Sequence, residues 1–303
     1  MSTSRPSLRV LLAIVITVLA WASAFVVIRG TGEHFSPGAL TLARVFVGTV
    51  LLAIVVVIGR AWVRPTRREW FQLVGYGVIW FGLYNFALNS AEQTLDAGTT
   101  AMLVNIGPLL IALGAGLLLG EGVPRWLAIG AGVSFLGVIL IGIATSGGGV
   151  GDAAGITWAL VAAVTYAAGV LLQKPALKRL PAAQVTFLGC AIGMVACLPF
   201  AGELAHDLAA APASAVLGAV YLGAVPTALA FSTWAFALSR MPAGQLGIST
   251  YVVPPLAIAL GFLVFGEIPA LTAIIGGAVC LVGVAVSRRR SAVVPASAKS
   301  LAE

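Results

Sequence analysis

The chain has 303 residues, of which 60% are hydrophobic and only 9% are charged, and its mean hydropathy is +1.07. A soluble domain carries about 25% charged residues, so this composition excludes a water-covered surface and predicts a protein solvated by lipid. The net charge of +7 does not indicate nucleic-acid binding, because the basic residues lie between apolar runs, where they set membrane topology. We therefore expect the lipid bilayer as a partner, and no nucleic acid.

The apolar residues form ten continuous runs, each about as long as a membrane-spanning helix. Continuous runs predict helices, because the strands of a membrane barrel alternate apolar and polar residues. In chain order the runs cover residues 8–28, 38–59, 69–88, 97–119, 125–143, 154–172, 183–201, 214–238, 243–265 and 269–287. The expected fold is an all-α integral membrane protein with ten transmembrane helices.

Charged residues between the runs predict the orientation. If all ten runs cross the membrane, fifteen lysines and arginines fall on one side, and the other side receives Arg29 and most acidic residues. Loops rich in lysine and arginine stay in the cytoplasm. Both termini are therefore expected to be cytoplasmic in a bacterial-type inner membrane.

An internal repeat divides the chain. The stretch AGTTAMLVNIGPLLIALGAGLLLGEG from Ala97 recurs as AGQLGISTYVVPPLAIALGFLVFGEI from Ala243, 146 residues later and without a gap. The first copy begins outside and the second inside, so we expect two inverted five-helix repeats, residues 1–150 and 151–290, before a disordered cytoplasmic tail, 291–303. Inverted repeats can open a shared central site to either side of the membrane, which predicts a transporter with alternating access.

The repeat extends upstream with small changes in register. Trp21 matches Tyr166, and Arg29 matches Lys174, at a shift of 145. The triplet 86–88 (Phe-Ala-Leu) matches the triplet 236–238 at a shift of 150. This predicts extra residues around positions 89–95 in the first half.

The sequences Trp21-Ala22-Ser23-Ala24-Phe25, Leu42-Ala43-Arg44 and Phe86-Ala87-Leu88, with the two Pro…Gly-Glu hairpins, resemble the drug/metabolite transporter (DMT) superfamily, in its ten-helix EamA-type branch. The resemblance covers all ten runs. It implies export of amino acids, other metabolites or toxic compounds, with YddG-type amino-acid exporters as the comparison we favour. It also implies a central cavity lined mainly by runs one, three, four, six, eight and nine.

Candidate cavity residues are polar and aromatic side chains at mid-depth, where neutral donors and rings suit an amphipathic solute. They are Trp21, Ser23, Trp80, Tyr84, Asn85, Asn89, Thr100, Asn105, Trp158, Thr165, Tyr166, Thr227, Trp234, Ser249, Thr250 and Tyr251. For any single one, packing or a hydrogen bond between helices is the alternative role. Prolines interrupt helical hydrogen bonding, so we interpret four as hinges, with static kinks as the alternative: Pro108, Pro226, Pro254 and Pro255.

Three charged residues are interpreted as structural. Arg44, inside the second run, is expected to reach the headgroups or to pair with a neighbour. Glu121 and Glu267 stand at helix ends, where a carboxylate can cap the following helix. Because no acidic residue lies in the middle of a run, no dedicated proton or sodium site is expected. Facilitated diffusion fits at least as well as antiport.

An enzyme is disfavoured, because His34 and His206 lack the spacing of metal ligands and no catalytic motif is present. We expect no catalytic residues, no metal and no cofactor. The prediction is a monomeric exporter of small amphipathic metabolites, most consistent with neutral amino acids that include aromatic and hydrophobic ones. The alternatives are an exporter of drugs or other metabolites from the same superfamily, and a membrane enzyme or scaffold without transport activity.

Overall fold

The computed structural model describes residues 7–118, 125–145 and 150–287, and all regular structure in these ranges is helical. Eight spans in them are long and apolar enough to cross a membrane, by length and composition. Two shorter apolar stretches, Ile129–Ile141 and Leu271–Gly283, lie in α7 (Arg125–Thr145) and α15 (Leu271–Ser287). The prediction of an all-helical membrane protein is confirmed, and ten crossings stay a prediction.

The expected runs of the first half correspond to single helices or to consecutive helical segments. Runs one and two form α1 (Leu8–Thr31) and α2 (Pro37–Gly59). Run three is α3 (Arg67–Tyr76), a π-helical segment (Gly77–Tyr84) and α4 (Asn85–Ala91). Run four is divided into α5 (Ala97–Val104) and α6 (Gly107–Leu118).

The second half has a similar order of segments, except that its second run is interrupted by a 3₁₀ turn. Runs six and seven form α8 (Val150–Ala176), then α9 (Ala182–Cys197), a 3₁₀ turn and α10 (Ala201–Ala210). Run eight is α11 (Ala213–Leu222), a π-helical segment (Gly223–Leu229) and α12 (Ala230–Leu238). Run nine is α13 (Ala243–Gly247), a 3₁₀ segment (Ile248–Val252) and α14 (Val253–Phe265).

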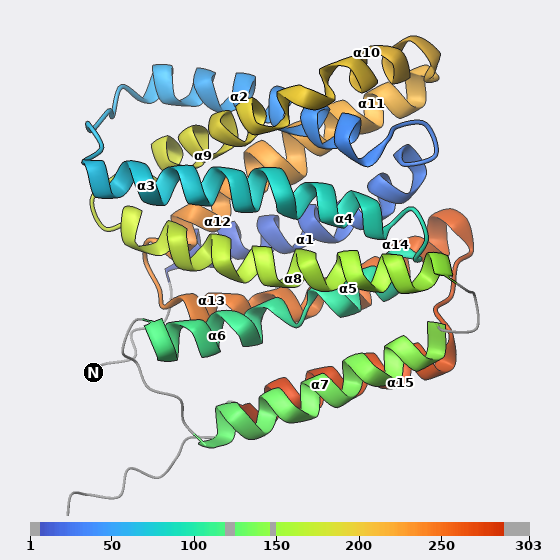
Figure 1. Ribbon diagram of the computed structural model, residues 1–303. Helices are drawn as coiled ribbons and strands as arrows, with labels where there is room; N and C mark the ends of the chain where they lie inside the picture. Colours follow the sequence, from blue (N-terminus) through green and yellow to red (C-terminus); the bar gives the residue numbers. More distant parts are fainter. Residues whose placement is uncertain (1–6, 119–124, 146–149, 288–303) are drawn as a thin grey trace, which may run out of the picture.

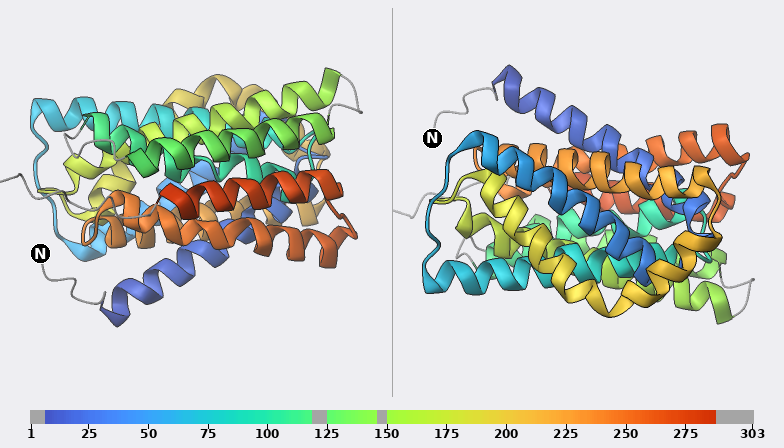
Figure 2. Two further views of the ribbon diagram at one scale, coloured as in Figure 1. Left: turned by 90° about the horizontal axis from the view of Figure 1, so that it is seen from below. Right: turned by 90° about the horizontal axis from the view of Figure 1, so that it is seen from above.

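Most helices run lengthwise along the bundle, α1 crosses it obliquely, and α9 and α10 together form a bent, arch-like rod (Figure 2). Figure 1 shows α7 and α15 as a pair at one edge of the bundle and α2, α9, α10 and α11 at the opposite edge. Between them lie α1, α4, α5 and α8. This arrangement brings segments from both halves of the chain to the middle of the bundle.

The α7–α15 pair is antiparallel, and residues 146 apart contact each other in it. Ser134 Oγ donates to the carbonyl of Cys280 at 3.0 Å, and Cys280 Sγ donates to the carbonyl of Ser134 at 3.2 Å. Cβ atoms added at Gly276 and Gly283 would lie 2.7 Å and 2.6 Å from the carbonyls of Gly137 and Gly130. Glycine therefore allows the close backbone contact of this pair.

The predicted extra residues in the first half are absent. The π-helical segments begin at Gly77 and Gly223, and the helices after the next turn begin at Ala97 and Ala243. Each pair is 146 residues apart, so the two halves have equal length in this region. The Phe-Ala-Leu match was misleading, because short apolar triplets recur by chance in membrane helices.

Side chains donate hydrogen bonds to backbone carbonyls in or next to both π-helical segments. Asn85 donates from Nδ2 to the carbonyls of Trp80 at 3.3 Å and Phe81 at 2.8 Å. In the second half, Thr227 Oγ1 donates to the carbonyl of Leu222 at 2.8 Å. Pro226 lies in the same segment and has no N–H to donate. Without such bonds, these carbonyls would lie unpaired in an apolar interior.

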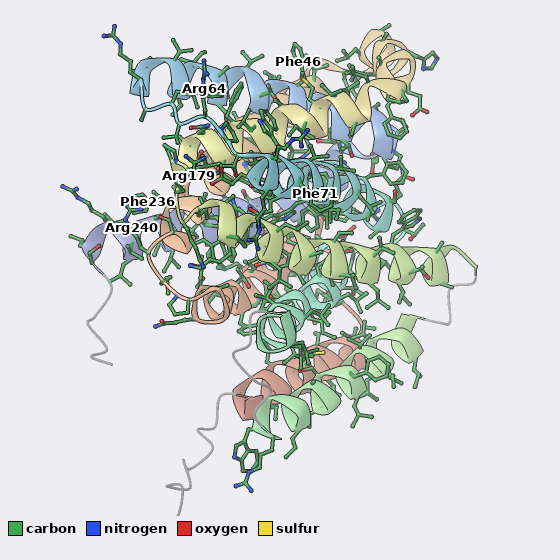
Figure 3. All side chains as sticks on the ribbon, turned by 60° about the vertical axis from the view of Figure 1, so that its left-hand side comes forward. Phe46, Arg64, Phe71, Arg179, Phe236 and Arg240 are labelled. Carbon is green, nitrogen blue, oxygen red and sulfur yellow. The ribbon has the colours of Figure 1, made fainter. Side chains whose placement is uncertain are left out.

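Opposite charges mark the two ends of the bundle. The basic end consists of the turns 60–66, 177–181 and 239–242, and the acidic end of the turns 32–36, 92–96 and 266–270. Arg64, Arg179 and Arg240 gather at the basic end (Figure 3), where Arg179 pairs with Glu69. At the acidic end, Arg29 Nε lies 3.1 Å from Glu267 Oε1.

Apolar side chains cover the flanks between these ends. Phe46 and Phe71, labelled in Figure 3, are 54% and 79% exposed on the outside of the bundle. Such an apolar surface suits lipid, because exposed apolar area of this extent is unfavourable in water.

Candidate functional site

A small cavity lies in the middle of the bundle, and we call it the central cavity. Its volume is about 40 Å³, well below the roughly 300 Å³ at which drug-sized ligand pockets begin. Its lining residues come from both halves of the chain: Trp21, Ala24, Phe25, Arg44, Tyr84, Leu88, Ala101, Val104, Asn105, Tyr166, Phe231, Thr250 and Val253. A metabolite fits only if some of these side chains move.

Aromatic rings dominate one part of the cavity. The Trp21 ring centroid lies 5.0 Å from that of Trp234, 5.6 Å from Phe231 and 6.0 Å from Tyr166. Trp80 completes this aromatic cluster, at 6.5 Å from Trp21. Tilted and edge-to-face rings at these distances attract each other beyond simple burial. The cluster supplies an apolar surface for a solute.

The aromatic cluster extends from the cavity toward the basic end. Trp80 and Trp234 are each 1% exposed, and Trp234 stands in the last turns of α12, which ends at the basic end. The Tyr76 ring, at the end of α3, lies 5.6 Å from that of Trp80. Packed rings therefore close the cavity on this side.

Polar side chains occupy the part of the cavity nearer the acidic end. Arg44 is 2% exposed and donates from Nη1 to Asn89 Oδ1 at 3.1 Å. Asn89 Nδ2 donates in turn to Thr41 Oγ1 at 2.9 Å. Arg44 therefore points into the bundle and joins α2 to α4, and it does not reach toward the headgroups.

Glu92 is a buried residue that sequence reasoning did not single out. It follows α4 directly, is 2% exposed, and neither carboxylate oxygen has a hydrogen-bond partner within the described residues. Burial raises the pKa of this carboxyl well above its ordinary value, although the charges of Arg44 and Arg29 oppose the shift. The internal repeat, at a shift of 146 residues, matches Glu92 with the apolar residue Leu238. This match was the one sequence feature that could have predicted the burial of Glu92.

The divided helices of runs four and nine meet beside the cavity. Thr250 Oγ1 donates to the carbonyl of Gly247 at 2.7 Å and lies 3.5 Å from Asn105 Oδ1. Pro108 stands in the first turn of α6, and Pro254 and Pro255 in the first turn of α14. These three prolines follow the breaks in their helices, and Pro226 lies inside a π-helical segment. Their role as hinges stays a prediction.

A second cavity of about 180 Å³ lies between the breaks in runs four and nine and the α7–α15 pair. Asn105 lines both cavities. Tyr251, Pro254 and Pro255 line this second cavity together with Ser134, and not the central one.

Several predicted cavity residues have structural bonds and do not line the central cavity. The hydroxyls of four of them donate to carbonyls of the preceding turn or its cap: Thr100, Thr165, Thr227 and Ser249. Ser23 Oγ lies 2.8 Å from the hydroxyl of Tyr221. The Trp158 ring packs against Phe86 at 5.4 Å. Sequence reasoning missed seven apolar lining residues, because an apolar side chain does not stand out within an apolar run: Ala24, Phe25, Leu88, Ala101, Val104, Phe231 and Val253.

Of the two glutamates matched by the repeat, Glu121 and Glu267, the structure describes only Glu267. Glu121 lies outside the described residues. Glu267 makes an ion pair with Arg29, and its Oε2 has no hydrogen-bond partner within the described ranges. The ion pair with Arg29 of α1 is a structural contact, and capping of the following helix by Glu267 stays a prediction.

No group of three His, Cys, Asp or Glu side chains in the described part of the chain is arranged to hold a metal ion. The three cysteines, Cys190, Cys197 and Cys280, are free and buried. The site is thus one of rings, amides and hydroxyls with a single buried guanidinium in its wall.

Known proteins share this sequence pattern. The model of the EamA-like transporter family matches residues 8–143 and again residues 153–289. The chain belongs to the EamA-like transporter family. This confirms the resemblance drawn from its motifs, and the family and its named relatives are transporters rather than enzymes.

Curated relatives align with this chain over most of their own length. A probable terminal-alkyne amino-acid exporter of Streptantibioticus cattleyicolor is 34% identical over 92% of this chain and 93% of its own. The uncharacterized transporter YdfC of Bacillus subtilis is 33% identical over 87% and 86% of the two chains. A probable amino-acid metabolite efflux pump of Salmonella typhimurium is 25% identical over 83% and 85%.

A solved crystal structure shares the fold of this EamA protein. It has a TM-score of 0.64 and 21% sequence identity, and the match covers 92% of this chain and 96% of the other.

Proposed function

We propose that this EamA-family protein exports small amphipathic metabolites, foremost neutral amino acids with aromatic or aliphatic side chains, through the central cavity. The observation that carries the proposal is the cavity wall, where Trp21, Tyr166 and Phe231 face the same space as Arg44 and Asn105. Such a wall offers an apolar surface and polar groups to one solute. The probable amino-acid exporters among the relatives support the same substrate class.

We propose that transport follows alternating access between two inverted repeats, residues 1–150 and 151–290, with ten membrane crossings in all. The antiparallel contact of α7 and α15 supports this reading, because the bonded residues Ser134 and Cys280 are 146 apart. The π-helical segments at Gly77 and Gly223 support it as well. Rocking of one half against the other would open the cavity at either end in turn.

The small cavity volume suggests a closed conformation. A cavity of about 40 Å³ has room for only a few water molecules, so an amino acid enters only when rings of the cluster separate. Helix breaks before Pro108 and Pro254 are places where such movement costs little hydrogen bonding.

The basic end is the proposed cytoplasmic end. Loops rich in arginine and lysine stay in the cytoplasm. We therefore propose that both chain termini lie on the cytoplasmic side of an inner membrane. Because one chain supplies both halves of the cavity wall, we expect the monomer to be active.

Purified protein in liposomes tests the proposal. Vesicles are preloaded with radiolabelled phenylalanine, leucine, alanine, glutamate or lysine, and efflux is compared with that from protein-free vesicles. We expect efflux of the neutral amino acids, with phenylalanine and leucine the fastest. An absence of efflux for every amino acid would overturn the amino-acid assignment, and a strict need for a pH gradient would replace facilitated diffusion by proton coupling.

A further inference from the structure

The guanidinium of Arg44 is buried in the cavity wall, and it makes no ion pair with any described residue. It is 2% exposed, and its described hydrogen bond goes to a neutral amide, Asn89 Oδ1. Its Nε is buried and has no partner within the described residues. None of the ion pairs of the described ranges includes Arg44. A buried, unpaired charge is strongly unfavourable, so the site is suited to an anion.

Glu92 is a carboxyl near enough to Arg44 to act on it electrostatically, but it does not neutralise the charge of the guanidinium. No hydrogen bond or ion pair joins them, and both Glu92 oxygens lack partners within the described part of the chain. Its burial favours the neutral acid over the carboxylate. The other ionisable groups that act on Glu92 are those of Arg29, Tyr84, Asp96 and Glu267.

Asn89 holds the guanidinium in one orientation. It accepts from Nη1 of Arg44, and its own Nδ2 is bound to Thr41 Oγ1. The planar fork of arginine donors matches a carboxylate, which can accept two parallel N–H bonds. With Nη1 engaged by the amide, Nε stays available as a donor to a bound anion.

The guanidinium and the aromatic cluster belong to the same cavity, whose wall contains Arg44 and Leu88 as well as Trp21, Tyr166 and Phe231. We propose that Arg44 binds the carboxylate of the substrate, so that the amino acid lies with its carboxylate toward the acidic end and its side chain against the rings. This inference rests on the proposed export function and adds to it that a carboxylate is required. The repeat-matched position in the other half is Gly189, so the chain has one such group and the substrate one orientation.

Ligands that differ only in the carboxylate test this requirement on the unmodified protein. Phenylalanine and its alcohol analogue phenylalaninol, which lacks the carboxylate, compete with labelled leucine for efflux from liposomes. We expect phenylalanine to compete about 10- to 100-fold more strongly, as for a lost charge-assisted hydrogen bond. Equal competition alongside active leucine efflux overturns the role of Arg44 and leaves the export function standing. An absence of any leucine efflux overturns the export function itself.

Variants then assign the preference to one side chain. Arg44→Gln should abolish the preference for phenylalanine over phenylalaninol, and Arg44→Lys should retain part of it, because lysine keeps the charge without the fork. Arg240→Gln is the matched control, since it removes an exposed arginine at the basic end that contacts the Phe236 ring. If Arg44→Gln keeps the wild-type preference, the proposal is wrong.

A second variant covers the case in which Arg44→Gln fails to fold. Asn89→Ala leaves the guanidinium in place and removes the amide that orients it. We expect a severalfold smaller preference for phenylalanine, with the charge retained. An unchanged preference in Asn89→Ala would contradict the orienting role of Asn89.

Discussion

The two ends of the bundle have matching backbones and different side chains. At the acidic end, the charged and polar side chains of Arg44, Asn89 and Glu92 lie together. Shifts of 145 and 146 residues match them with Gly189, Ala235 and Leu238 at the basic end. The positions correspond, because Arg29 donates to the carbonyl of Glu92 and its match Lys174 donates to the carbonyl of Leu238.

Aromatic packing replaces the polar group at the basic end. A Cβ added at Gly189 would lie 2.2 Å from Cε1 of Tyr76, so glycine makes room for this ring. The Tyr76 hydroxyl accepts a hydrogen bond from Gln173 Nε2 at 2.9 Å. The two halves thus share a backbone arrangement, while the diverged side chains give the cavity a polar end and an apolar end.

The largest effect is expected from a methyl group at the basic end. Gly189→Ala places a Cβ against the Tyr76 ring, and overpacking of this kind costs roughly 1–3 kcal/mol. We expect a clearly lower melting temperature in detergent and a loss of transport. Gly132→Ala is the control, because nothing lies within 4 Å of the added Cβ. Equal melting temperatures for the two variants would show that the basic end is not closely packed.

The next effect concerns the apolar end of the cavity. Trp21→Ala removes the ring that contacts Trp80, Tyr166, Phe231 and Trp234. We expect the KM for phenylalanine efflux to rise about tenfold, because a buried aromatic anchor often contributes more than 1 kcal/mol to binding. The KM for alanine should change less. Trp62→Ala, at a half-exposed position outside the cavity, should change neither value.

A smaller loss of stability is expected when the contacts of Arg29 at the acidic end are removed, and two variants distinguish these contacts. Arg29→Met removes both the ion pair with Glu267 and the bond to the Glu92 carbonyl, whereas Glu267→Gln removes only the charge of the partner. The side chains of the pair are 31% and 26% exposed, so we expect the pair itself to contribute about 1 kcal/mol or less. The melting temperature should therefore fall more in Arg29→Met than in Glu267→Gln. A larger fall in Glu267→Gln would contradict this account.

The smallest change is Glu92→Gln, whose effect is expected to depend on pH. The pKa of Glu92 is raised in the folded protein, so the folded state keeps a proton on this carboxyl as pH rises. The unfolded chain releases the same proton above about pH 4.3. Wild-type stability therefore falls as pH rises from there to the folded pKa, and the glutamine variant lacks this loss. Melting temperatures measured from pH 5 to pH 8 should diverge in favour of Glu92→Gln. Parallel curves would show that Glu92 is ionised in the folded state.

Much of the fold follows from sequence patterns that are local. Long apolar runs predict helices because each helix satisfies its own backbone in lipid, and the repeated stretch from Ala97 and Ala243 predicts a duplicated body. Trp21, Tyr84, Asn105, Tyr166 and Thr250 were predicted cavity residues, and they line the central cavity. These predictions needed only hydropathy, side-chain chemistry and position along a run.

Other features depend on which helix faces meet, and no local pattern contains that information. Glu92 follows a helix end, as exposed turn residues do, and becomes buried only because helices from other parts of the chain cover it. The same packing turns Arg44 toward Asn89, 45 residues away, and gathers rings from three other helical segments around Trp21. The sequence by itself determined the membrane, the helices and the family, because these depend on composition and order. Only the tertiary structure decided where the charges and rings lie around the cavity, because that depends on contacts between residues far apart in the chain.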